Sequence, residues 1–264
     1  MSATTSIRPT PGVQPALAVK DLRPGLGRLI AVELRKMVNT RSGFWVPIGV
    51  GFVTLLVAVI ASINHGGNAA TFTHVLHAAS DPLAYLLPVM GVLLVCGEWS
   101  QRTKLATFTL VPSRPRVIAA KVGASWVVST VALAGLLLFT VVSVSLFGHH
   151  PGGAGSLTWQ VITQSWLYLA STMVIGLAFG AALLVSAPAI VVYLLLPAVW
   201  GTLVSNISAF RGIGNWLDSS QTLSPLTVHA FGTTDWVHAF ATIGVWAGIP
   251  ILIGWWRIGR GDID

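Results

Sequence analysis

Six apolar stretches separated by polar segments dominate this sequence. They cover residues 44–63, 82–97, 122–147, 158–186, 187–206 and 236–256. A helix of about 20 apolar residues is long enough to cross about 30 Å of hydrocarbon. Only 9% of the 264 residues are charged, whereas a soluble domain carries about 25%. The sequence therefore predicts an all-α membrane protein, with six transmembrane helices in a single domain that covers residues 24–264.

The basic residues predict the orientation of these spans. If the N-terminus is cytosolic, seven Lys and Arg residues precede the first span, five lie between the second and third, and two follow the sixth. Fourteen of the 15 basic residues then lie on the cytosolic side, and Arg211 alone lies outside. Because basic residues collect in cytoplasmic loops, we expect both termini in the cytosol. The net charge of +7 thus reflects topology, and we expect no nucleic-acid partner.

The N-terminal region divides into two parts before the first span. Residues 1–23 are rich in Ser, Thr, Pro and Ala and have no apolar periodicity, so we expect a disordered cytosolic tail. Apolar residues then recur every three or four positions through 24–42, with basic residues on the other side. This pattern predicts an amphipathic helix that lies in the membrane interface.

A polar and basic segment, residues 98–121, separates the second and third spans. It holds five of the 15 Lys and Arg residues, and two prolines break it into pieces. We expect it to present a short structured element to a cytosolic partner and to receive a force rather than carry out chemistry. The alternative is that its charges cap the second span and contact phospholipid headgroups. We expect that role for Arg114, Arg116 and Lys121.

Two further polar segments lie on the outer side. Residues 64–81 carry several histidines, and we expect a loop that ends at Asp81 or a few residues earlier. Residues 208–235 mix apolar pieces with polar residues, which favours short re-entrant or interfacial helices. Small residues on the fourth span predict a close contact with another helix. These are Gly176, Gly180, Ala181 and Ala182.

Catalytic motifs are absent from the sequence. It contains no HExxH and no GxxxxGK[ST] pattern, so we expect no metalloenzyme chemistry and no ATP binding by this route. His74 and His77 are three residues apart and close to Asp81, which leaves an external metal site as a weaker alternative. We expect the acidic residues to lie at span ends. The lack of an ionisable group near the midplane disfavours an ion-coupled secondary transporter.

Two strings carry a resemblance to a known family. They are VELRKMVNTRSGFW at 32–45 and GEWSQRTKLATFTLVPSRPRVIAAK at 97–121. With its span pattern, the chain resembles the integral-membrane permease subunit of bacterial ABC-2 type transporters. The resemblance implies an elbow helix at about 26–40, a coupling helix at about 98–109 and re-entrant helices at about 208–235. It also implies a multi-pass protein of the bacterial plasma membrane.

The resemblance implies partners, and with them a function. The permease would pair with a second copy of itself or with a paralogous permease, and cytosolic ATPase subunits would bind ATP and Mg. No cofactor is expected in this chain, which would be a transporter subunit and not an enzyme. The expected ATPase-coupling residues are Glu98, Arg102, Thr103 and Lys104.

The substrate path should be lined by the second and fifth spans, by analogy with the family. Its polar candidates are Thr202, Ser205 and Asn206. An otherwise apolar path favours export of a hydrophobic or amphipathic small molecule, such as a drug, an antibiotic or a lipid-like compound. Two alternatives remain: a secondary transporter driven by an ion gradient, and a membrane enzyme with an external histidine metal site.

Overall fold

The computed structural model describes residues 25–64, 72–100, 114–147, 158–207 and 211–260, and these contain helices and no strand. The long helices are α2 (Arg41–Ile63), α3 (Phe72–Ser100), α5 (Arg114–Phe147), α6 (Trp159–Leu183) and α7 (Ser186–Asn206). The first described helix is α1 (Leu26–Val38), and the last described elements are α10 (Thr233–Ile243), the π-helical turn η3 (Gly244–Gly248) and α11 (Ile249–Arg260). Short helices between α7 and α10 are α8 (Arg211–Leu217), α9 (Ser219–Leu223) and the 3₁₀ turn η2 (Ser224–Thr227).

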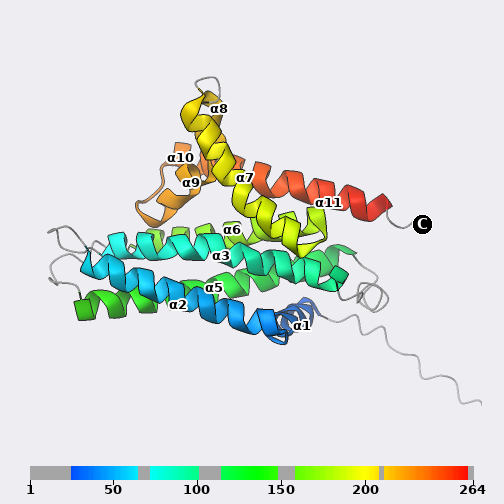
Figure 1. Cartoon of the computed structure of the whole chain (residues 1–264), viewed down its shortest axis with the longest axis horizontal. Helices are drawn as coiled ribbons and strands as arrows, with labels where there is room; N and C mark the ends of the chain where they lie inside the picture. Colours follow the sequence, from blue (N-terminus) through cyan, green and yellow to red (C-terminus); the bar gives the residue numbers. More distant parts are fainter. Residues whose placement is uncertain (1–24, 65–71, 101–113, 148–157, 208–210, 261–264) are drawn as a thin grey trace, which may run out of the picture.

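Six of these helical segments are long and apolar enough to cross a membrane, as the sequence predicts. The sixth is the continuous run of α10, η3 and α11. The N-terminal helix α1 and the end of α11 lie toward the same end of the bundle (Figure 1). A chain that crosses a membrane an even number of times begins and ends on the same side.

Two spans begin earlier than the sequence predicts. Helix α3 begins at Phe72 rather than at residue 82, and α5 begins at Arg114 rather than at residue 122. The expected loop at 64–81 is therefore helical from residue 72 onward. Its polar side chains contact other parts of the fold: the Nδ1 atom of His77 lies 2.7 Å from the Oγ1 atom of Thr227 in η2. Such contacts let a helix continue past its apolar core.

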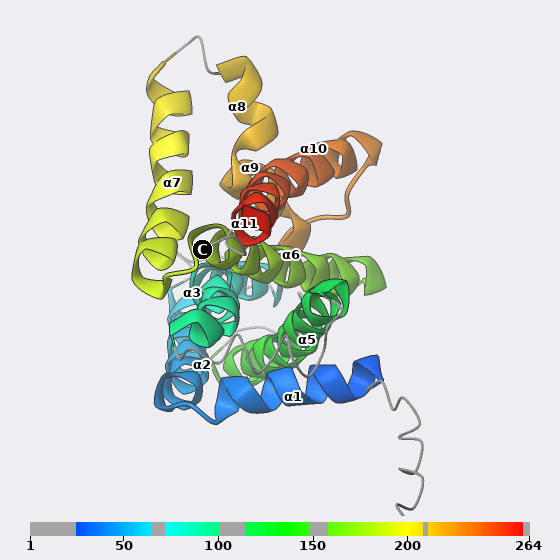
Figure 2. The same ribbon diagram turned by 90° about the vertical axis from the view of Figure 1, so that its right-hand side faces the viewer.

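Helices α3 and α6 form the centre of the bundle (Figure 2). Their backbones approach closely because glycines line the contact: a Cβ atom on Gly91 would lie 2.6 Å from the carbonyl oxygen of Met173. Similarly, a Cβ atom on Gly180 would lie 3.1 Å from the Cα atom of Val92. The predicted small-residue face of α6 is thus confirmed as a helix contact.

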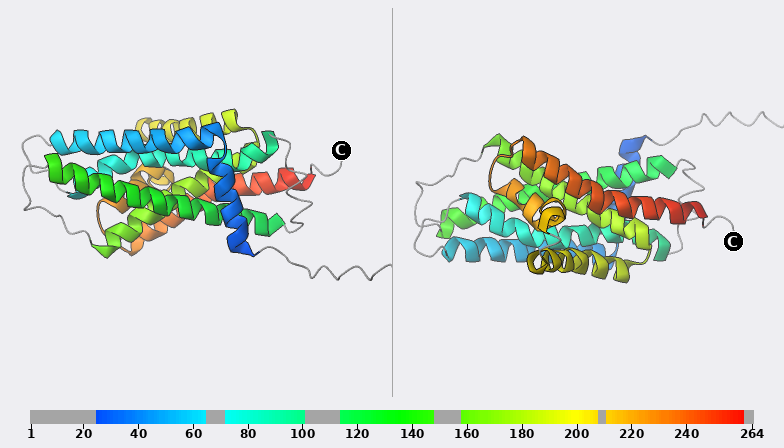
Figure 3. Two further views of the ribbon diagram at one scale, coloured as in Figure 1. Left: turned by 90° about the horizontal axis from the view of Figure 1, so that it is seen from below. Right: turned by 90° about the horizontal axis from the view of Figure 1, so that it is seen from above.

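Helix α1 crosses the end of the bundle at a steep angle to the long helices (Figures 2 and 3). Its buried residues are Glu33 and Met37, whereas Arg28 and Arg35 are exposed. A helix with one buried face is therefore present in this region, and its place in the membrane interface stays a prediction. A tight turn leads from α1 into α2, where the Oγ1 atom of Thr40 accepts a hydrogen bond from the backbone N–H of Gly43.

The short helices α8 and α9 pack against the last span, whereas η2 packs against α6 and α3. Thr242 of α10 donates to the carbonyl oxygen of Trp216 at 2.7 Å and accepts from the hydroxyl of Thr222 at 2.9 Å. In η3, the indole N–H of Trp246 donates to the carbonyl oxygen of Leu217 at 2.7 Å. Short helices are thus present between the fifth and sixth spans. The sharp turn from α6 into α7 uses Leu184, whose φ is +59°.

Candidate functional site

A buried charge cluster joins the N-terminal helix to two spans. The Nζ atom of Lys121 in α5 lies 2.7 Å from the Oε2 atom of Glu33 in α1. It also donates to the carbonyl oxygen of Leu94 in α3 at 3.0 Å. Lys36 completes the cluster, with its Nζ atom 2.8 Å from the Oε1 atom of Glu33. The side chains of Lys121 and Glu33 are only 7% and 6% exposed.

The sequence brings these groups together through the apolar face of α1. Ile30 packs against Gly123 of α5, where even a Cβ atom would lie 2.6 Å from the Cδ1 atom of Ile30. Glu33 follows Ile30 by three residues, and Lys121 precedes Gly123 by two. Residues three apart on a helix share a face. Packing of α1 on α5 therefore carries the carboxylate of Glu33 to the ammonium group of Lys121.

The cluster lies beside the two ends of the predicted coupling region. Leu94 belongs to the last turns of α3, which ends at Ser100, and Lys121 belongs to the first turns of α5, which begins at Arg114. The ammonium group of Lys121 therefore joins α5 to both α1 and α3, and α3 and α5 are the helices that flank residues 101–113. A displacement of either flanking helix would strain these hydrogen bonds, so the cluster can transmit a movement to α1.

The expectation that Lys121 contacts phospholipid headgroups is wrong. Its side chain is buried and pairs with Glu33, because the early start of α5 places Lys121 inside the helix bundle. A sequence signal for this cluster does exist. Glu33 lies among the apolar residues Ile30, Leu34 and Met37 of α1, and a carboxylate on the apolar face of an amphipathic helix needs a partner.

The predicted coupling residues lie at the edge of the described residues or outside them. Glu98 lies in the last turn of α3, and its side chain is not among those described. Arg102, Thr103 and Lys104 lie outside the described residues, as do most of the expected coupling helix and the tail at 1–23. Their role in coupling stays a prediction.

The predicted substrate-path residues lie together at the end of α7. Thr202 donates to the carbonyl oxygen of Ala198 at 2.8 Å, and Ser205 and Asn206 donate to the carbonyl oxygen of Thr202 at 3.0 and 2.8 Å. All these bonds remain within the helix, and the three side chains belong to exposed residues. Their polar groups are thus compatible with an apolar surrounding. A place on the substrate path stays a prediction.

Three of the described histidines lie on different segments and have different neighbours. His77 contacts Thr227, His229 packs near Phe231, and the ring of His238 lies 4.3 Å from that of Trp216. Among the described residues, no group of three or more His, Cys, Asp or Glu residues could hold a metal ion. His65, His149 and His150 lie outside the described residues.

Asp81 does not lie at the end of a span. It belongs to the interior of α3, four residues after His77, and is half-buried. The sequence-based interpretation placed it at the end of the loop 64–81, directly before the second span. Pro82 is instead accommodated inside the helix. An ionisable residue within a span is unusual and often functional.

No family model matches this sequence, and no curated protein matches it. The geometry and the sequence motifs are therefore the basis for the function.

Proposed function

We propose that this chain is the membrane-spanning permease subunit of an ABC-2 type transporter in a bacterial plasma membrane, with both termini in the cytosol. It exports a hydrophobic or amphipathic small molecule. A separate cytosolic subunit binds ATP and Mg and hydrolyses ATP, and a second permease completes the transporter. In this proposal α1 is the elbow helix, residues 98–109 contain the coupling helix, and α8, α9 and η2 form the re-entrant segment.

The observation that carries the proposal is the contact of Lys121 with both Glu33 and Leu94. A permease driven by a separate ATPase needs a rigid connection between the segment that binds the ATPase and the membrane-spanning helices. Helices α3 and α5 flank the polar segment that resembles a coupling region, and Lys121 joins them to α1. The amphipathic α1 lies across the bundle (Figure 3), where an interfacial helix is expected.

The mechanism follows from a difference in binding energy between two states. Closure of the ATPase subunits on ATP displaces residues 98–109, which moves the ends of α3 and α5. Because Lys121 holds these ends to α1, the three helices move together. ATP can shift the equilibrium between inward and outward states only by the difference in its affinity for them.

Co-purification with candidate ATPase subunits tests this function. The chain is expressed with ATPase subunits from the same genome, and ATPase activity is measured in the purified complex. The variant combines Glu98→Ala, Arg102→Ala and Lys104→Ala. We expect the wild type to form a complex and the triple variant to lose binding or the stimulation of ATPase activity.

The matched control removes basic residues from the same segment but outside 98–104, as the double variant Arg114→Ala, Arg116→Ala. It should retain the complex and its activity. If no ATPase subunit binds the wild type in mild detergent, the proposed function is wrong. Equal loss in the control would show that the effect is not specific to residues 98–104.

A second candidate function is supported by Asp81 inside α3. Ion-coupled secondary transporters use ionisable residues within their spans, and His77 lies one helical turn from Asp81. In this case the purified chain alone would move a solute along a proton gradient.

Proteoliposomes that contain only this chain distinguish the two candidates. A proton gradient is imposed, and efflux of ethidium, a hydrophobic cation, is followed by fluorescence. Efflux that depends on the gradient and is lost in Asp81→Asn would support the secondary transporter. An absence of efflux without the ATPase, together with ATP-dependent efflux in its presence, would support the permease.

A further inference from the structure

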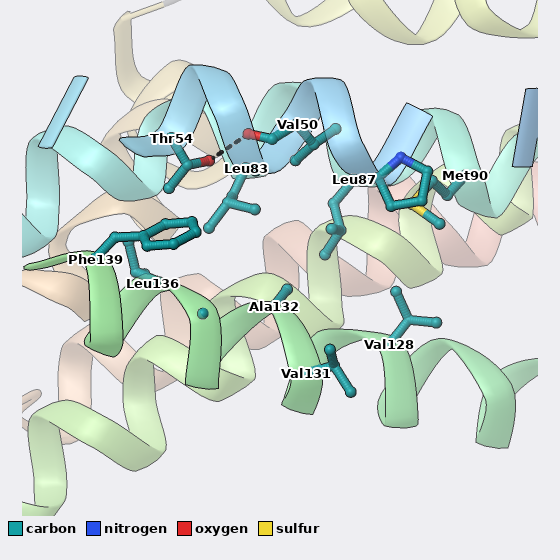
Figure 4. Close-up of a pocket in the computed structure, with 13 residues that line it drawn as sticks. Val50, Thr54, Leu83, Leu87, Met90, Val128, Val131, Ala132, Leu136 and Phe139 are labelled. Carbon is teal, nitrogen blue, oxygen red and sulfur yellow. Dashed lines mark hydrogen bonds between the residues drawn. The ribbon is translucent and has the colours of Figure 1, made fainter. Parts of the chain in front are cut away.

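A hollow of about 200 Å³ lies between α2, α3 and α5 (Figure 4). Side chains such as Leu87 of α3 and Val131 and Phe139 of α5 surround it. A closed apolar cavity of about 150 Å³ is large enough for a benzene molecule. The hollow can therefore hold a segment of a hydrocarbon chain.

Two glycines create this space. Gly51 of α2 and Gly135 of α5 both line the hollow, and a Cβ atom added to either would have no heavy atom within 4 Å. Most glycines at helix contacts let two backbones approach, as Gly91 does. These two leave room instead.

The lining offers an occupant no free hydrogen-bond donor. Thr54 provides the hydroxyl in the hollow, and this group donates to the carbonyl oxygen of Val50 at 2.8 Å (Figure 4). The remaining lining side chains are apolar. A water molecule needs two to four polar partners in a buried place, so an apolar occupant suits this hollow better than water.

The hollow is accessible from the membrane-facing surface, where Val131 is 68% exposed. Its depth can be followed along α2, which begins at Arg41 beside α1. Pro47 and Thr54 lie about 9 and about 20 Å along the helix from this start, at 1.5 Å per residue. One leaflet accounts for about 15 Å of hydrocarbon. The hollow therefore spans the deeper part of the leaflet on the side of α1 and reaches slightly past the bilayer midplane, where the ends of acyl chains lie.

The charges at this end favour one kind of lipid. Arg28, Arg35 and Arg41 are exposed. Among the described side chains of α1 and α2, the acidic one is Glu33, which is buried and paired. Basic residues near the membrane surface attract anionic headgroups, at about 1 kcal/mol for each residue.

We propose that the hollow between α2, α3 and α5 binds one acyl chain of an anionic phospholipid from the leaflet on the side of α1. The bound chain fills the space left by Gly51 and Gly135 and packs against Leu87. This inference is independent of the proposed transport function, because it depends only on the bundle and on its place in a membrane.

Native mass spectrometry of the purified chain tests the proposal. The protein is reconstituted with equal amounts of phosphatidylglycerol and phosphatidylcholine, and the lipids retained after delipidation in detergent are counted. We expect the wild type to retain one phosphatidylglycerol preferentially. Gly51→Leu and Gly135→Leu fill the hollow, and each should weaken retention about tenfold, the effect of about two methylene groups losing their burial.

Gly49→Leu is the matched control. Gly49 also has open space around its Cβ position and lies two residues from Gly51, but it does not line the hollow. This variant should retain lipid as the wild type does. Equal retention in all four proteins would overturn the proposal. Equal retention of the two lipids by the wild type would overturn its anionic part.

A photoreactive lipid gives a second test that needs no variant. Phosphatidylglycerol with a diazirine on its acyl chain is irradiated with the wild type, and labelled residues are mapped. Leu87 is 2% exposed, whereas Leu138 of α5 is 59% exposed. Label on Leu87 as well as on Leu138 is expected. Label on Leu138 alone, or cross-links between two copies at the hollow, would overturn the proposal.

Discussion

Lys121 of α5 and Glu33 of α1 form a buried ion pair, with 2.7 Å between Nζ and Oε2, across 88 residues of sequence. The same ammonium group donates to the carbonyl oxygen of Leu94. The N-terminal helix is thus attached to the bundle by a directed polar contact in addition to its apolar face. This attachment has consequences for stability and for coupling that can be measured separately.

Replacement of Lys121 by methionine should destabilise the protein. It leaves the carboxylate of Glu33 buried, in contact with the ammonium group of Lys36. Loss of one partner of a buried ion pair costs about 3–5 kcal/mol, and the contact with Lys36 places the expected loss near the lower end, at about 3 kcal/mol. The measurement is the free energy of unfolding in mixed micelles.

The double variant Glu33→Met, Lys121→Met is the control for this ion pair. It removes both charges, so its stability should return close to that of the wild type. In the complex with an ATPase, however, the double variant should couple ATP hydrolysis to transport less well, since α1 is no longer held to α3. A double variant as unstable as Lys121→Met would contradict this account.

Gly176→Ala should loosen the central contact between α3 and α6. The added Cβ atom would lie 2.6 Å from the Cα atom of Pro88, and the backbones must separate to admit it. Overpacking of this kind costs about 1–3 kcal/mol.

Gly49→Ala is the matched substitution for Gly176→Ala, because its Cβ atom has no neighbour within 4 Å. Alanine is the better helix former, so this variant should be as stable as the wild type or more stable by up to about 1 kcal/mol. Thermal unfolding in one detergent compares the two. Equal effects would show that the close approach of α3 and α6 has no energetic importance.

Thr242→Val should release α8 and α9 from the last span. The valine keeps the shape but leaves the carbonyl oxygen of Trp216 without this donor and the hydroxyl of Thr222 without this acceptor. We expect a loss of about 1–2 kcal/mol, and faster hydrogen exchange at the amides of α8 and α9. Thr163→Val, at an exposed position that bonds only within its own helix, should leave this exchange unchanged.

The distribution of basic residues predicts the topology in the membrane. A membrane-impermeant maleimide applied to intact cells should label His150→Cys, in the segment between the third and fourth spans, and should leave Ser6→Cys and Asp264→Cys unlabelled. The native Cys96 is buried, so it should contribute little background. Labelling of Ser6→Cys from outside would reverse the proposed orientation.

The sequence alone determined the features that depend on local composition. The number of spans follows from the length of each apolar run, because a helix in hydrocarbon satisfies its own backbone. The amphipathic α1 follows from the spacing of its apolar residues, and the contact face of α6 from Gly176 and Gly180. Each of these properties depends on one stretch of fewer than 30 consecutive residues, so the rest of the chain is not needed to predict it.

Only the tertiary structure decided which polar groups lie inside the bundle. Asp81 directly precedes Pro82, and Lys121 ends the polar and basic segment 98–121, yet both belong to helix interiors. A helix continues through polar residues when distant segments supply partners, as Glu33 does for Lys121 and η2 does for His77. The hollow beside Gly51 and Gly135 likewise depends on three helices together. These contacts join segments that are far apart in the sequence. The local sequence pattern therefore could not predict them.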